Sequence, residues 1–149
     1  MLSLQQVSDR LEIEQQMVAY STAIDQRDWD ALDQVFTPDA YIDYRAVGGI
    51  DGKYPQVKAW LKEVLAKFPN YYHLLGNLSL KVEGDQAKSK VICFNPMRIE
   101  LPGGKSQVMF IGIWYVDEWL RTPRGWRMTQ RVEEKCFDFN VPGGLDAGN

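Results

Sequence analysis

The sequence predicts an α+β fold in which three helices precede one long antiparallel sheet. Apolar residues recur at helical intervals over residues 8–68, whereas long alternating segments separated by short turns follow from residue 72 onward. At 149 residues the chain is long enough to build a complete hydrophobic core. We therefore expect a single domain over residues 1–149, with about 141–149 forming a loose C-terminal tail.

The first predicted helix runs from Ser8 to Arg27, where apolar residues recur every three or four positions. Either Ser8 or Asp9 can cap its start. Asp25 lies seven residues after Val18, two helical turns further on, so it projects from near the buried stripe. A carboxylate near a helix C-terminus is electrostatically disfavoured, which invites a functional explanation. A simple helix-end carboxylate in water is the alternative.

Two further helices are predicted before the sheet. A short one covers residues 28–36 and stops at the turn-forming residues 37–40, after which the chain extends from Tyr41 to Arg45. The third helix spans residues 57–68, because its apolar residues keep helical spacing until Pro69 ends it.

The sheet is predicted to be an antiparallel meander. Short turns containing glycine separate four strands, at roughly 72–83, 86–100, 106–120 and 125–139. In the last strand one alternating set is strongly polar and is predicted to face solvent; it consists of Arg127, Thr129, Arg131, Glu133 and Lys135. The other set is predicted to be core, although Gln130 and Glu134 interrupt it; its apolar members are Trp126, Met128, Val132 and Cys136.

Composition excludes several classes of function. The formal net charge of −3 gives no basic footprint, so we expect no nucleic-acid partner. The longest apolar run, residues 108–116, is too short to cross a bilayer, and the N-terminus lacks a signal-peptide pattern, so we expect a cytoplasmic protein with no membrane partner. Nucleotide-binding, serine-hydrolase and zinc-ligand motifs are absent, and the single histidine rules out a two-histidine metal site within one chain. We expect neither a metal nor a cofactor.

His73 is the only histidine and stands where the third helix gives way to the first long strand. Functional residues collect at such element ends. A structural histidine with one satisfied hydrogen bond is the competing interpretation, and composition by itself favours it.

Taken together, these features resemble the SnoaL-like family of the nuclear transport factor 2-like superfold, whose lyases include scytalone dehydratase, bile-acid dehydratase and hexachlorocyclohexane dehydrochlorinase. The resemblance covers nearly the whole chain. It rests on the order of helices and meander, on the helix-turn phrase at residues 28–40, and on the positions of Asp25 and His73. It implies a cone-shaped α+β barrel, with three N-terminal helices packed on a curled, mostly antiparallel sheet that encloses a pocket.

The same resemblance implies that Asp25 and His73 form a catalytic dyad, with His73 as general base and Asp25 orienting its ring. Such a dyad suits a cofactor-independent lyase that abstracts a C–H proton from a hydrophobic, cyclic small molecule while hydroxide or halide departs. Tyr20 and Tyr44 match positions of active-site tyrosines, which would donate hydrogen bonds; core packing is the alternative for both.

Two further residues are candidates for substrate binding. Asn95 interrupts an apolar face and is either a polar group of the cavity or a residue beside a bulge at Pro96. Arg131 matches roughly the place of a pocket arginine in some lyases, whereas the bare alternation puts it on a solvated strand face.

Alternatives to a lyase remain open at the level of sequence. A polyketide cyclase or a steroid-type isomerase would use acid–base groups in the same cone. A noncatalytic binding module, or a protein like the small subunit of a ring-hydroxylating dioxygenase, is a further alternative. Both faces of the strand segment 109–116 are apolar, so we expect a homo-oligomer; the resemblance favours a trimer, with a dimer as the alternative.

Overall fold

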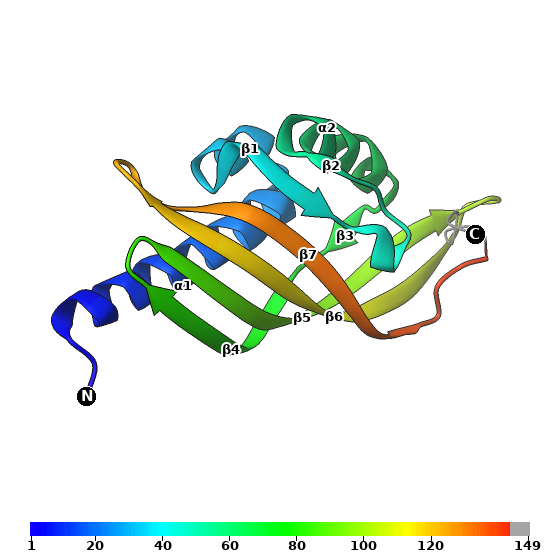
Figure 1. Ribbon diagram of the computed structural model, residues 1–149. Helices are drawn as coiled ribbons and strands as arrows, with labels where there is room; N and C mark the ends of the chain where they lie inside the picture. Colours follow the sequence, from blue (N-terminus) through cyan, green and yellow to red (C-terminus); the bar gives the residue numbers. More distant parts are fainter. Residues whose placement is uncertain (144–149) are drawn as a thin grey trace.

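The structure is a computed structural model that describes residues 1–143, so most of the predicted tail at 141–149 lies outside the described residues. Two α-helices and one seven-stranded sheet form the fold (Figure 1). The helices are α1 (Leu4–Gln26) and α2 (Tyr54–Val64), and the short 3-10 helices are η1 (Trp29–Gln34), η2 (Arg45–Val47) and η3 (Leu65–Lys67). The strands are β1 (Phe36–Asp43), β2 (Asp51–Lys53), β3 (Asn70–Tyr71), β4 (Leu74–Glu83), β5 (Gln86–Leu101), β6 (Lys105–Thr122) and β7 (Gly125–Phe139).

The α+β class and the mostly antiparallel sheet are confirmed. Strands β4 to β7 pair antiparallel in chain order, and the N-terminal β1 joins β7 in parallel. Both α-helices lie on one side of the sheet and leave its other face uncovered (Figure 1). No helix in residues 1–143 is both long and apolar enough to cross a membrane.

Helix α1 begins earlier than predicted. Ser3, not Ser8 or Asp9, is its N-cap, and it forms a capping box with Gln6. The buried stripe is also displaced from the predicted one, because Val18 is exposed; the stripe consists of Asp9, Ile13, Met17, Tyr20, Ser21, Ala23 and Ile24. This stripe carries Asp9 and Tyr20 into the interior.

The prediction of three N-terminal helices is confirmed only in part, because the second is a short 3-10 helix. Residues 28–36 form only the 3-10 helix η1, which Asp28 caps, and β1 already starts at Phe36. The predicted turn at 37–40 is therefore part of the strand. Pairing between β1 and β7 is interrupted there and resumes at Tyr41, so Pro38 occupies an irregular stretch where a missing N–H donor is tolerated.

One irregularity in β7 decides which of its side chains face the core. Met128 pairs with Trp119 and Gln130 pairs with Glu118, so Thr129 is an extra residue, a β-bulge. Before it, Trp126 and Met128 are buried; after it, the buried residues of β7 are Arg131 and Glu133. The predicted polar, solvent-facing set is therefore wrong at these two positions, because strict alternation does not survive a bulge.

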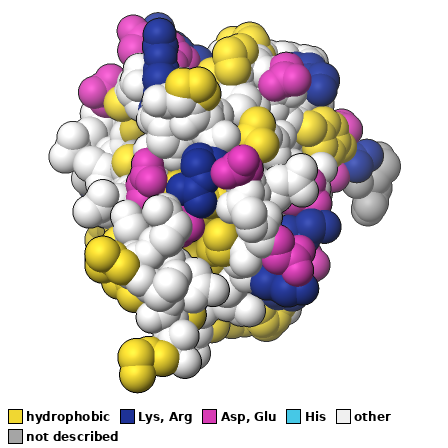
Figure 2. All heavy atoms as spheres, turned by 60° about the vertical axis from the view of Figure 1, so that its left-hand side comes forward, with side chains coloured by type: hydrophobic (Ala, Val, Ile, Leu, Met, Phe, Trp, Pro, Cys, Tyr) yellow, Lys and Arg dark blue, Asp and Glu magenta, His cyan; other side chains and the backbone are white. Residues whose placement is uncertain are grey.

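The uncovered face of the sheet carries an outer aromatic cluster, which we define as Phe94, Phe110, Phe137 and Phe139. Phe110 stacks on Phe139 with ring centroids 4.9 Å apart and also contacts the other two rings. Gly112 makes this packing possible, since a Cβ there would lie 2.6 Å from the Phe137 ring. Figure 2 shows another side of the molecule, the left-hand side of Figure 1, where basic side chains lie beside acidic ones and form no basic patch.

Candidate active site

Asp25 and His73 meet where the last turn of α1 approaches the start of β4. His73 Nδ1 lies 2.6 Å from Asp25 Oδ1, and the backbone N–H of His73 donates to Asp25 Oδ2 at 3.2 Å. A carboxylate accepts but does not donate, so Nδ1 carries the proton of this bond. None of the side-chain hydrogen bonds found in residues 1–143 engages Nε2 of the ring. The imidazole thus has one nitrogen held and one available.

The segment that carries His73 is tied to the end of α1. Arg27 ends the helix in the left-handed conformation, with φ of 59°, and its guanidinium donates to the carbonyls of Leu65 and Phe68. Tyr71 returns a bond from its hydroxyl to the carbonyl of Ile24 at 2.9 Å. These contacts hold the two ends of the Asp25–His73 pair at a fixed separation.

Asn95 supports the same segment from β5. Its side chain is 8% exposed, and Nδ2 donates to the carbonyl of Tyr72 at 3.0 Å. Asn95 also lines the cavity next to His73. The bulge expected at Pro96 is not found, because β5 and β6 pair there without a register shift. Asn95 is a polar residue of the cavity wall whose hydrogen bond is to the backbone next to His73.

A cavity of about 150 Å³ opens in front of His73. Much of its wall is apolar, formed by Ile24, Val47, Trp60, Leu61, Val64, Leu65, Phe68, Met97, Met109, Ile111 and Val141. Side chains with polar groups form the rest of the wall: Tyr20, Tyr44, His73, Asn95, Tyr115, Glu133, Lys135 and Asp138. Apolar walls with a few convergent polar groups are typical of small-molecule sites.

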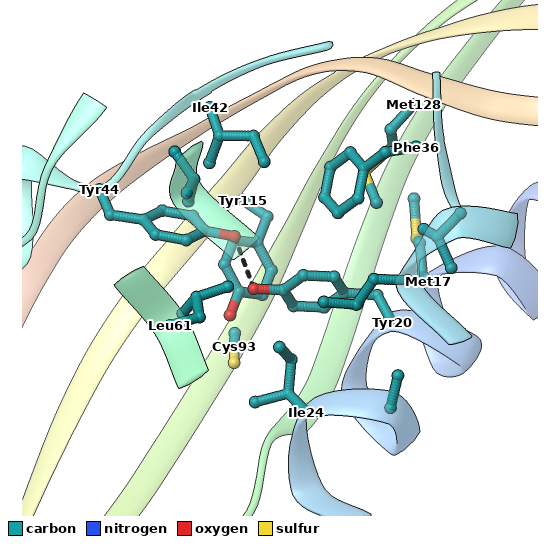
Figure 3. Close-up of a cluster of buried hydrophobic side chains, with 14 of the residues drawn as sticks. Met17, Tyr20, Ile24, Phe36, Ile42, Tyr44, Leu61, Cys93, Tyr115 and Met128 are labelled. Atoms are coloured by element: carbon teal, nitrogen blue, oxygen red, sulfur yellow. Dashed lines mark hydrogen bonds between the residues drawn. The ribbon is translucent and has the colours of Figure 1, made fainter. Parts of the chain in front are cut away.

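Tyr20 and Tyr44 form a hydrogen-bonded pair on the cavity wall. Their hydroxyl oxygens are 2.6 Å apart and both side chains are buried, as Figure 3 shows together with the apolar residues around them. Burial raises the pKa of Tyr20 to about 12 and that of Tyr44 well above its usual value. Both phenols are therefore protonated near neutral pH. One O–H joins the pair, and the other proton remains free to donate to a ligand.

Arg131 is not on a solvated face but buried beneath the tyrosines, at 1% exposure. Its guanidinium lies between the rings of Tyr20 and Tyr115, 4.2 and 3.8 Å from their centroids, and makes a two-pronged ion pair with Asp117. Burial alone would lower the pKa of Arg131, but the Asp117 carboxylate outweighs this and holds it well above normal. Arg131 does not line the cavity among the described residues; it supports the rings that do.

Tyr115 and Glu133 were not predicted as site residues. They are directly opposite each other in the β6–β7 pairing, so their side chains share the inner face. The Tyr115 ring lies 5.7 Å from that of Tyr20, which in turn lies 6.4 Å from the His73 ring. Glu133 was missed because the bulge at Thr129 changes which side chains of β7 face inward. Tyr115 was missed because it lies within an apolar run of the sequence. No pattern in the sequence marked either residue.

Metal ligands are not gathered at this site. Within the part of the chain that the structure describes, no three His, Cys, Asp or Glu side chains are grouped so that they could hold a metal ion.

Comparison with known proteins adds a family and several relatives. A family model for the SnoaL-like domain matches residues 5–132. Uncharacterized proteins of Mycobacterium tuberculosis and Mycobacterium bovis are 62% identical over 137 residues, which cover 92% of this chain and 92% of each of theirs.

Solved structures share the fold. A candidate aromatic ring hydroxylase from Novosphingobium aromaticivorans superposes with a TM-score of 0.79 at 28% identity, covering 96% of this chain and 98% of its own. A candidate scytalone dehydratase from the same organism gives 0.78 at 16% identity, covering 96% and 95%. A hexachlorocyclohexane dehydrochlorinase from Novosphingobium barchaimii gives 0.79 at 18% identity, covering 94% of both chains.

Proposed function

Because the chain belongs to the SnoaL-like domain family, we propose that it is a cofactor-independent lyase whose Asp25–His73 dyad removes a C–H proton from a hydrophobic, cyclic small molecule. One observation carries this proposal. The 2.6 Å contact between Asp25 and His73 Nδ1 leaves Nε2 available at the cavity. Similarity to a candidate dehydratase and to a dehydrochlorinase supports the class of reaction.

The proposed chemistry starts with a proton transfer. Nε2 accepts the C–H proton, and the imidazolium that forms is stabilised by the Asp25 carboxylate on the other side of the ring. The electron pair of the C–H bond becomes the new double bond as the leaving group departs from the neighbouring carbon. The free hydroxyl proton of the Tyr20–Tyr44 pair suits an oxygen on which negative charge develops.

The cavity limits the substrate class. Its largely apolar walls favour a compact molecule with little polar surface, and aromatic side chains such as Trp60 and Phe68 fit the faces of a ring. We therefore use β-hydroxycyclohexanone as a probe. It has an acidic C–H beside its carbonyl, a hydroxyl on the next carbon, and a conjugated product, cyclohexenone, that is followed by ultraviolet absorbance.

The experiment has a structural arm and a kinetic arm. Nitrogen NMR of the only imidazole in the chain should show that Nδ1 carries a proton. Elimination of the probe should be lost in His73→Ala. A ring protonated at Nε2, or turnover that survives His73→Ala, would exclude the dyad mechanism.

A noncatalytic subunit is the second candidate. Likeness to a candidate aromatic ring hydroxylase and the exposed outer aromatic cluster favour it. That function has no use for a proton-accepting Nε2, so it predicts that His73→Ala leaves binding of a partner unchanged.

We also propose that the protein is a homo-oligomer, with a trimer favoured over a dimer. The outer aromatic cluster leaves Phe137 50% and Phe139 58% exposed, which is unusual for large apolar side chains on a free surface. Light scattering after size-exclusion chromatography measures the mass directly, and a mass equal to 17.1 kDa at micromolar concentration would exclude the oligomer.

A further inference from the structure

Glu133 is a buried carboxyl group for which the dyad mechanism has no role. Its side chain is 8% exposed, it lines the cavity, and its Oε2 is buried without a hydrogen-bond partner. Arg131, two residues away on the same strand face, donates from Nε and Nη2 to Asp117, and its remaining Nη1 makes no hydrogen bond to Glu133. A carboxylate left without a partner in such surroundings is costly, whereas a protonated carboxyl is tolerated and gains a proton that it can donate.

Burial, more than the charged groups nearby, favours the protonated form of Glu133. Burial is the largest influence and disfavours the charged carboxylate of Glu133. The positive charge of Arg131 stabilises that carboxylate, whereas the negative charges of Asp43 on β1 and Asp117 on β6 destabilise it. Together they raise the pKa of Glu133 to about 8. The remaining charged residues on the cavity wall, Lys135 and Asp138, are paired with each other at 3.0 Å. A neutral Glu133 near pH 7 is the outcome of these surroundings.

A neutral acid in the cavity distinguishes between leaving groups. Chloride departs as a stable anion and needs no proton. Hydroxide is a poor leaving group, and a proton delivered as the C–O bond breaks lets it leave as water. A cavity built only to expel halide would have no use for an unpartnered carboxyl.

We propose that Glu133 is the general acid of this site and that the group it helps to expel is a hydroxyl, so that the reaction is a dehydration rather than a dehydrohalogenation. This inference rests on the proposed lyase function. His73 Nε2 takes the C–H proton, the C–H electron pair forms the C=C bond, and the C–O bond breaks. The departing oxygen takes the Glu133 proton and leaves as water. Transfer of the His73 proton through water to Glu133 then restores both groups, and the net change is substrate to alkene plus water.

The first test needs no turnover. Ordinary carboxyl groups are ionised at pH 7, so a carboxylic-acid C=O band in the infrared spectrum at that pH reports a carboxyl with a raised pKa. The band should vanish in Glu133→Gln and persist in Glu134→Gln. Glu134 is the matched control, because it is next in sequence but exposed and paired with Lys90. Absence of the band in the wild type, or its survival in Glu133→Gln, would overturn the assignment.

The second test compares two probes that give the same product. β-Hydroxycyclohexanone and β-chlorocyclohexanone lose the same proton and both yield cyclohexenone, so only the leaving group differs. Glu133→Gln should slow the hydroxy compound by about 10²-fold or more and leave the chloro compound nearly unchanged. In the wild type, elimination from the hydroxy compound should fall above a pH of about 8, as Glu133 ionises. Equal losses on both probes, or none on either, would overturn the role of Glu133.

The two proposals fail in different ways. If His73→Ala retains turnover of both probes, or the wild type converts neither, the lyase function fails; the infrared band still decides whether Glu133 is a neutral acid. If His73→Ala abolishes both reactions while Glu133→Gln affects them alike, the dyad stands and the dehydratase assignment falls.

Discussion

Helix α1 carries an aspartate near each end, and the two have opposite surroundings. Asp9 is 3% exposed and accepts hydrogen bonds from the Arg121 guanidinium, the Trp126 indole and Gln5. The Asp25 side chain is 24% exposed, and one side chain, His73, bonds to it. Both aspartates join the helix to a distant part of the sheet.

The difference lies in what each partner can do with a proton. An arginine is always charged and gives none up, so its bond to Asp9 is purely structural; hydrogen bonds from Arg121 and Trp126 outweigh burial and lower the pKa of Asp9 to about 2. A histidine gains and loses a proton near neutral pH. The same residue type on one helix thus serves architecture at one end and is suited to chemistry at the other.

Substitution at the His73 end should have the largest effect, and mainly on the rate of the proposed reaction. Asp25→Asn should lower elimination of the β-hydroxycyclohexanone probe by about 10³-fold or more, because the ring loses the charge that stabilises its imidazolium. The free energy of unfolding, measured in urea, should change by only about 1 kcal/mol, as expected for one hydrogen bond. An Asp25→Asn variant that is strongly destabilised, but whose folded fraction keeps the wild-type rate, would contradict this prediction.

Substitution at the Asp9 end should instead lower the stability and leave the rate of the reaction unchanged. Asp9→Asn should lower the free energy of unfolding by roughly 3 kcal/mol, since it leaves the Arg121 charge without its main partner. Turnover by the folded variant should match the wild type. Asp85→Asn is the control: Asp85 also pairs with Arg121 but its side chain is 75% exposed, so its loss should cost about 1 kcal/mol or less.

Acid should weaken the Asp9 end selectively. Because the pKa of Asp9 is lower in the folded protein than in the unfolded chain, the unfolded state binds the proton first as pH falls. The Asp9 carboxylate should contribute about 2 kcal/mol to the free energy of unfolding. This contribution is fully present above about pH 4 and should be lost as the pH falls through about 2. Urea unfolding at a series of pH values should show this loss in the wild type, and Asp9→Asn should lack it.

The smallest expected effect concerns how the His73 end is held. Arg27→Ala removes the guanidinium contacts to the carbonyls of Leu65 and Phe68, and should cost about 1 kcal/mol of stability. Probe turnover should fall about tenfold, since small displacements of a catalytic pair are costly. Lys67→Ala is a suitable control, because Lys67 is a basic residue of η3 that makes no such contact among the described residues. Equal turnover in Arg27→Ala and Lys67→Ala would show that the contacts of Arg27 do not help to position the Asp25–His73 pair.

Sequence reasoning found the four long strands β4 to β7 and the residues Asp25 and His73 for different reasons, but it did not predict β2 or β3. Glycine turns at residues 84, 103 and 125 bound long alternating segments, so strand limits were accurate to within a few residues. His73 stood out because it is the only histidine, and Asp25 because its place near a helix C-terminus is unfavourable. Their catalytic role stays a prediction.

What sequence reasoning missed came from register and burial. The first of two bulges in β7, at Thr129, shifts the alternation, so that Arg131 and Glu133 lie in the interior instead of on the predicted surface and Glu134 lies on the surface. Tyr115 was hidden for the opposite reason, because a tyrosine inside an apolar run gives no sign of which way its hydroxyl points. Both errors are tertiary in origin and do not follow from local pattern.

The parallel pairing of β1 with β7 fixes the order in which the protein can fold. Tyr41 pairs with Gln130, and Asp9 on α1 bonds to Arg121 and Trp126, so α1 and β1 depend on β6 and β7, which are synthesised well after them. Contacts so distant in sequence close slowly, and a chain emerging from the ribosome exposes the apolar stripe of α1 until β6 and β7 arrive. Folding of this domain thus waits for β7, and a chain truncated within β7 loses the pairing partner of β1 as well as β7 itself.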